Sequence, residues 1–314
     1  MLQMKQTLCR VMAVAILSLC AHSQSAHYSM LCSLTRESKN PAVSLAGIHL
    51  EIGVHARKAS GIKISLSEGP RRIMILRDMS ASMTGGNEQK LLLQAVKDFV
   101  ELSPAIDQFA LIDFSDKPHT QIDLQNADQF SKQLDDLESS KPPLPRGHTA
   151  IFDTIYAAAS YLQKNPQEDD SILVITDGDD NASTVDLTKL KEYLLRSKIR
   201  LYLFVLSSPP VSPVQENKRP ELMQLMVDTG GRLTGVASKT MLIEPNFDAS
   251  PTTIALLRER VAALQYLIQK AYRIEFHLDA PLAKQTRLDT KLVTTDNKPA
   301  KGLQLLCPKY IYPN

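Results

Sequence analysis

Apolar residues in the middle of the chain alternate between short continuous runs and helical spacing. The run at 73–76 predicts a buried strand, and the apolar positions of 87–102 recur every three or four residues, which predicts a helix. The further expected strands are 108–114, 120–124, 171–176, 199–206 and 232–236, and the further helices are 128–137, 150–163, 187–197 and 221–228. Strands that alternate with helices pair in parallel. We therefore predict an open, doubly wound, mostly parallel sheet with helices on both faces.

Both ends of the chain show the period of two that is typical of strands. Residues 43–66 are rich in β-branched side chains and predict two strands around a turn near 59–61. A long helix over 251–271 precedes alternating segments at 272–278, 285–294 and 302–306. We expect an N-terminal β segment at 24–69, an α/β domain at 70–245, and a C-terminal helix and β segment at 246–314. The last should pack with 40–69 in one small β-rich subdomain.

The first 23 residues have the layout of a secretory signal peptide. Lys5 and Arg10 flank the start, residues 11–20 are mostly apolar, and small residues at 21 and 23 fit a cleavage site. We expect cleavage and export to the periplasm, the medium or the cell surface; a buried N-terminal helix is the alternative. No further apolar run is long enough for a transmembrane span in the mature chain.

The charge of the chain bears on its possible partners, and its cysteines bear on a possible disulfide. The chain has 36 basic and 34 acidic residues, and two of the bases lie in the leader, so the mature chain is nearly neutral. Nucleic-acid binding needs a concentrated basic surface and is not expected. Outside the leader only Cys32 and Cys307 remain. In an exported protein this pair favours a disulfide, with two free buried thiols as the alternative.

Oxygen-bearing side chains follow two of the predicted strands and precede one helix. Asp78, Ser80 and Ser82 come after the strand at 73–76, Asp177 follows the strand at 171–176, and Thr149 precedes the helix at 150–163. The carboxyl ends of parallel strands share one edge, so these side chains can converge. Two carboxylates and three hydroxyls suit Mg²⁺, Mn²⁺ or Ca²⁺ rather than zinc or copper. Because only two of these five ligands are charged, a bound cation keeps positive charge and can accept a carboxylate from another molecule.

The three motifs, D-x-S-x-S, G-x-T and T-D-G, resemble those of a von Willebrand factor type A (vWA) domain over roughly residues 70–240. The resemblance implies a metal-ion-dependent adhesion site (MIDAS). Ser80 and Ser82 would be direct ligands, Asp78 a direct or water-mediated one, Thr149 the threonine-loop ligand and Asp177 a water-mediated one. The chain looks similar to bacterial exported proteins with β segments on either side of such a domain.

Two residues depart from the vWA pattern. Ala81 stands where glycine is more frequent, and Arg77 precedes Asp78 where an apolar residue is usual. Arg77 either repels the cation or turns away to bind an acid such as Asp113. Neighbouring acids are ambiguous too, because Asp179 and Asp180 could support the site, or one of them could cap or solvate the loop.

These features favour an exported, non-enzymatic module that binds an Asp or Glu of a protein partner through a divalent cation. No nucleophile elbow and no phosphate loop is present. A metal-free structural scaffold of an envelope assembly is one alternative. A metal-dependent hydrolase with Asp78 as nucleophile is another, but its usual second acid is replaced by Ser80.

Overall fold

The computed structural model describes residues 25–36, 47–83, 87–139, 147–207, 219–237 and 249–313. The predicted signal peptide lies outside the described residues, as does most of each proline-rich loop. The sheets, helices and contacts given for this protein are those of the described residues.

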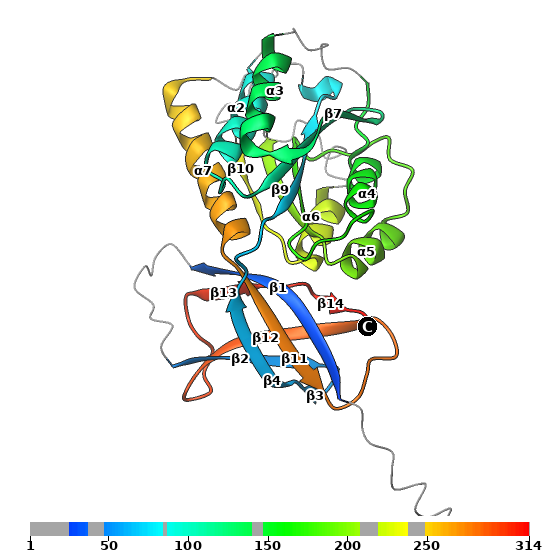
Figure 1. The fold of residues 1–314 in the computed structure, drawn as a ribbon, viewed down its shortest axis with the longest axis vertical. Coiled ribbons are helices and arrows are strands. Elements are labelled where there is room, and N and C mark those ends of the chain that lie inside the picture. Colours follow the sequence, from blue (N-terminus) through cyan, green and yellow to red (C-terminus); the bar gives the residue numbers. More distant parts are fainter. Residues whose placement is uncertain are drawn as a thin grey trace, which may run out of the picture.

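A six-stranded sheet forms the centre of the larger part of the molecule (Figure 1). Five strands are parallel, and β7 pairs antiparallel with β6 at one edge. In spatial order the strands are β10 (Leu233–Ala237), β9 (Arg200–Ser207), β8 (Ser171–Thr176), β5 (Arg72–Asp78), β6 (Gln108–Phe114) and β7 (Pro118–Asn126). The predicted doubly wound, mostly parallel sheet is confirmed.

Helices cover both faces of this sheet and enclose two separate apolar cores. One face carries α2 (Glu88–Glu101), α3 (Ala127–Ser139) and α7 (Pro251–Gln269); the other carries α4 (Ile151–Leu162), α5 (Leu187–Arg196) and α6 (Arg219–Asp228). Strand β5 contributes Ile73 and Ile75 to the first core and Met74 and Leu76 to the second. A strand buried on both faces reads as a continuous apolar run, which explains why the sequence shows no alternation there.

The two chain ends meet in a sandwich of two antiparallel four-stranded sheets. One sheet contains β13 (Leu303–Leu306), β1 (Ala26–Arg36), β11 (Ala271–Leu278) and β4 (Ser60–Leu66), in that order. The other contains β14 (Tyr310–Ile311), β12 (Thr286–Thr294), β2 (Ile48–Val54) and β3 (Arg57–Lys58). Both sheets contribute to one core. The buried Cys32 and Cys307 form a disulfide across 275 residues of sequence, which confirms the predicted bridge.

The N-terminal strands differ from the prediction in two respects. The turn lies at His55 and Ala56, which both have positive φ, and not near 59–61. Residues 57–66 pair first with β2 and then, beyond Ala59, with β11 of the opposite sheet. Strand β1 was not predicted individually, although it lies within the predicted N-terminal β segment at 24–69. Its alternation is obscured because one face lies in the sandwich core and the other packs toward the α/β part, where the Ser33 hydroxyl donates to the Leu267 carbonyl (2.6 Å).

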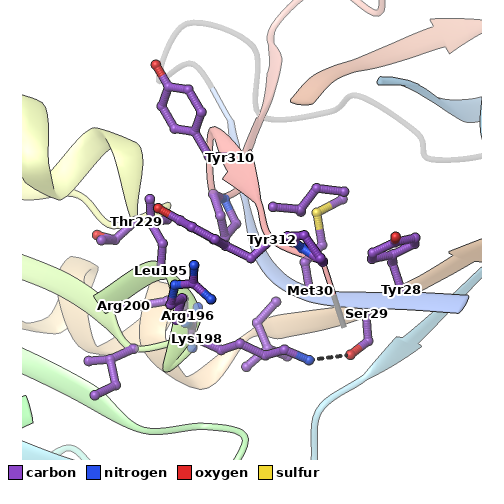
Figure 2. A pocket seen from close by; sticks show the side chains of 15 residues that line it. Tyr28, Ser29, Met30, Leu195, Arg196, Lys198, Arg200, Thr229, Tyr310 and Tyr312 are labelled. Carbon is purple, nitrogen blue, oxygen red and sulfur yellow. Dashed lines mark hydrogen bonds between the residues drawn. The ribbon is translucent and has the colours of Figure 1, made fainter. Parts of the chain in front are cut away.

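Helix α7 connects the two parts of the molecule. It packs on the sheet beside α2 and leads almost directly into β11 (Figure 1). Further contacts fasten the junction: Lys198 donates to the Ser29 hydroxyl (3.0 Å), and the Arg196 guanidinium lies 4.5 Å from the centre of the Tyr312 ring (Figure 2). The C-terminal helix therefore belongs to the α/β layers, whereas the strands that follow it complete the sandwich.

Candidate metal centre

Asp78 is the last residue of β5, and its carboxylate is fixed at the carboxyl edge of the sheet. One oxygen accepts the Ser80 backbone N–H (2.9 Å), and the other accepts the Thr176 hydroxyl from the end of β8 (2.6 Å). The side chain is fully buried. Because two adjacent strands hold it, this carboxylate has little freedom to move.

The two serines of the first motif lie directly beyond Asp78. Their hydroxyl oxygens are 3.0 Å apart, with Ser80 buried and Ser82 exposed. The Met79 N–H donates to the Phe114 carbonyl at the end of β6 (2.7 Å), and a short 3₁₀ turn, η1 (Ala81–Met83), follows. The loop thus presents two converging oxygens, one of which faces solvent.

Thr149 is buried just before α4 and is tied to both neighbouring loops. Its backbone N–H donates to the Asn181 side-chain oxygen (2.7 Å), and its carbonyl accepts the Asn181 backbone N–H (3.0 Å). The preceding Gly147 accepts the Ala81 N–H (3.2 Å) through its carbonyl. Gly147 has φ +81°, and a Cβ there would collide with the Asp116 carboxylate, so this turn needs glycine. The structure therefore links the threonine loop to the other two motifs.

Negative charge accumulates at this edge. Burial, and then the nearby charge of Asp177, raises the pKa of Asp78 to about 7. Burial also raises the pKa of Glu88, in the first turn of α2, and Asp177 adds a smaller contribution. Among the described residues, no lysine or arginine forms an ion pair with Asp78 or Asp177. The site is a group of carboxylates and hydroxyls without a basic counter-charge of its own.

Arg77 does not supply that charge. Its guanidinium donates to both oxygens of the Asp113 carboxylate, each at 2.7 Å, and both side chains are buried. Successive residues of a strand point to opposite faces, so Arg77 and Asp78 lie on different sides of the sheet. Of the two alternatives for Arg77, the structure selects the ion pair with Asp113.

Several supporting residues were not predicted from the sequence, or only ambiguously. Asp180 accepts the N–H groups of Phe152 in α4 and of Ser183, both at 3.1 Å, so it caps the helix that follows Thr149. Thr176 and Asn181 hold Asp78 and Thr149, respectively. The sequence signal for them is that Thr176 is the first residue of the T-D-G motif at 176–178 and that Asn181 follows this motif closely.

Comparisons with known proteins match a segment of the α/β part to a known domain family. Residues 73–179 match the family model of the von Willebrand factor type A domain. No protein of curated function matches the sequence. The described residues contain no helix that is both long and apolar enough to cross a membrane.

One solved structure shares the fold, and two others are similar to part of the chain. A von Willebrand factor type A protein from Catenulispora acidiphila is 13% identical and overlaps 83% of this chain and 71% of its own, with a TM-score of 0.51. An aerotolerance-related membrane protein from Bacteroides fragilis is 20% identical over 61% of this chain and 98% of its own (TM-score 0.42). Proximal thread matrix protein 1 from the mussel byssus, with a zinc-occupied MIDAS motif, is 17% identical over 69% of this chain and 49% of its own (TM-score 0.47).

The strand order, the matched residues and the fold similarity agree. Residues 73–179 of this chain belong to the von Willebrand factor type A domain family, whose domains serve as protein-interaction modules, and the α/β part around them has the fold of that family.

Proposed function

We propose that the carboxyl edge of the sheet binds Mg²⁺, or Mn²⁺ or Ca²⁺, and thereby captures an Asp or Glu of a protein partner outside the cytoplasm. The ligands are Asp78, Ser80, Ser82, Thr149 and Asp177. The observation that carries this proposal is the convergence of the Ser80 and Ser82 hydroxyls beside the buried carboxylate of Asp78.

The donor set fits a hard divalent cation. The Ser80 N–H donates to one Asp78 oxygen and the Thr176 hydroxyl to the other, whereas an ionised carboxylate offers about four lone-pair sites in total. Lone pairs therefore remain for a cation or for its water. Burying a carboxylate near a second one is unfavourable unless a positive charge compensates it. A divalent cation supplies that charge, and oxygen ligands are the ones that Mg²⁺ and Ca²⁺ prefer.

The same residues favour capture over catalysis. The proposed direct ligands include three neutral hydroxyls, so a bound cation would keep positive charge and accept a further carboxylate. Ser82 is exposed, which gives a partner access to this side of the site. A hydrolase with Asp78 as nucleophile usually needs a second acid two positions further on, and Ser80 stands there instead. We therefore assign the site to binding, and assign export to the leader at 1–23.

Partner capture should depend on both the metal and the threonine. Immobilised protein incubated with envelope extract should retain a partner in 2 mM Mg²⁺ and lose it in EDTA. Thr149→Ala should reduce capture at least about tenfold, because losing one ligand costs on the order of 1.4 kcal/mol or more. Thr188→Ala, at an exposed threonine of α5, is the matched control and should capture normally. Equal capture by all three proteins in EDTA would instead support a metal-free scaffold.

A further inference from the structure

The β-sandwich is open along one side, where the two sheets separate. Residues 57–66 begin in one sheet and end in the other, so β3 and the following Ala59 cover only the Ile52–Val54 end of β2. In the part of the chain that the structure describes, no strand lies on the outer side of β2 residues 48–51, and β4 is the last strand of its sheet. Two strand edges with unpaired backbone groups therefore flank the same gap.

The gap between these edges is apolar. A cavity of about 150 Å³ lies between the sheets, and all eight lining residues are aliphatic or tyrosine, among them Ile48, Leu50, Ile64, Ile274 and Leu292. Ile64 is 54% exposed and Leu66 38% exposed, although both face the interior side of β4. An apolar cavity of this size is large enough to hold a six-carbon ring. We call this apolar gap between the β2 and β4 edges the slot. It is large enough to accept aliphatic side chains of another molecule.

The edge formed by residues 57–66 is basic, whereas the β2 edge carries Glu51. The segment 57–66 carries Arg57, Lys58 and Lys63 and no acidic residue. Arg57 lies 3.5 Å from Asp279, and Glu275 lies opposite Lys63 in the register of β11 and β4, although among the described residues Lys58 and Lys63 have no acidic side chain within 4 Å. A lysine on an edge strand disfavours pairing with a second copy of the same strand, since like charges would meet. It favours a strand that brings acidic side chains.

We propose that β4 pairs with an extended segment of another protein in which apolar and acidic residues alternate. The apolar side chains would enter the slot, and the acidic ones would lie beside Lys63 on the outer face, since successive strand residues point to opposite sides. Main-chain hydrogen bonds to the β4 edge would supply the remaining affinity. This surface is separate from the metal centre, and binding to it does not require a metal.

The test uses three fluorescent seven-residue peptides, measured by polarisation on the full mature chain in EDTA. Valine alternates with glutamate in the first and with lysine in the second; the third has the composition of the first in shuffled order. The glutamate peptide should bind at least about tenfold more tightly than the other two, the size expected for well-placed charge and side-chain complementarity. Hydrogen exchange should show new protection at the β4 amides.

Two variants separate the contributions. Lys63→Glu should invert the preference between the glutamate and lysine peptides, and Ile64→Asp should weaken the glutamate peptide about tenfold by placing a charge in the slot. Ile106→Asp, at a 57% exposed isoleucine of the α/β part, is the matched control and should bind normally.

Equal binding of the shuffled peptide, or binding without β4 protection, would overturn the proposal. If the protein without peptide forms a concentration-dependent dimer in which the β4 amides are protected from exchange, the slot binds a second copy of the chain. If the β4 amides are protected at every protein concentration without peptide, another segment of the same chain occupies the slot. Either result also overturns the proposal.

Discussion

Asp78→Asn should stabilise the metal-free protein at pH 8, although it removes a ligand. In the folded chain burial and Asp177 raise the pKa of Asp78 to about 7, above its ordinary value of 3.8. The unfolded chain loses this proton near pH 4, so folding becomes less favourable as the pH rises from about 4 to 7. The full penalty, up to about 4 kcal/mol, is present above pH 7 and absent below pH 4. Asparagine has the same shape and carries no charge.

Urea unfolding in EDTA at pH 8 and pH 4 measures this effect. The free energy of unfolding of Asp78→Asn should exceed that of the wild type at pH 8, and the two should converge toward pH 4. Asp186→Asn is the matched control, because Asp186 is an exposed aspartate that caps α5 through the Lys189 N–H (2.8 Å). Its effect should be small at both pH values. A lower stability of Asp78→Asn at pH 8 would mean that the carboxylate is needed for the metal-free fold itself.

Removing the Cys32–Cys307 disulfide should have a comparably large effect. The bridge joins residues 275 apart and lies in the sandwich core. In the chain-entropy model such a loop contributes about 5.6 kcal/mol, because the crosslink restricts the unfolded chain. The double variant Cys32→Ser, Cys307→Ser should therefore unfold at much lower urea. The loss should be concentrated in the sandwich, which depends on the two chain ends meeting.

Hydrogen exchange by mass spectrometry distinguishes this result from global unfolding. In the double variant, β1 and β11 should exchange quickly, whereas β5 and β8 in the α/β part should stay protected. Reduction of the wild type should reproduce the pattern. Unchanged urea unfolding would show that packing alone holds the two ends together.

The sequence predicts the α/β part well because its signals are local. The strands at 108–114 and 171–176 coincide with β6 and β8, since both are short apolar runs between turn residues. The sandwich is harder to predict because its pairings are long-range. Strand β1 pairs with β11, more than two hundred residues away, and the switch of sheet at Ala59 depends on which strand lies nearby. No local pattern specifies either feature.

The candidate site likewise contains some residues that the sequence predicts and others that it does not. The residues at strand ends, such as Asp78 and Asp177, are recognisable because topology brings strand ends together. The orientation of Arg77 could not be decided from the sequence, because it depends on Asp113 lying opposite it in the paired register of β5 and β6. The roles of Thr176 and Asn181 were likewise not predictable, since Thr176 acts through one hydrogen bond between two strand ends and Asn181 through two hydrogen bonds between loops.

Calorimetric titration of the mature chain with Mg²⁺, repeated with Mn²⁺, tests the central claim most directly. We predict saturable binding of one ion per chain and a rise in the free energy of unfolding of about 2.7 kcal/mol when the ion is at a hundred times its dissociation constant. Asp78→Ala should abolish both effects. No heat of binding and no stabilisation of the wild type by either ion would contradict the metal centre.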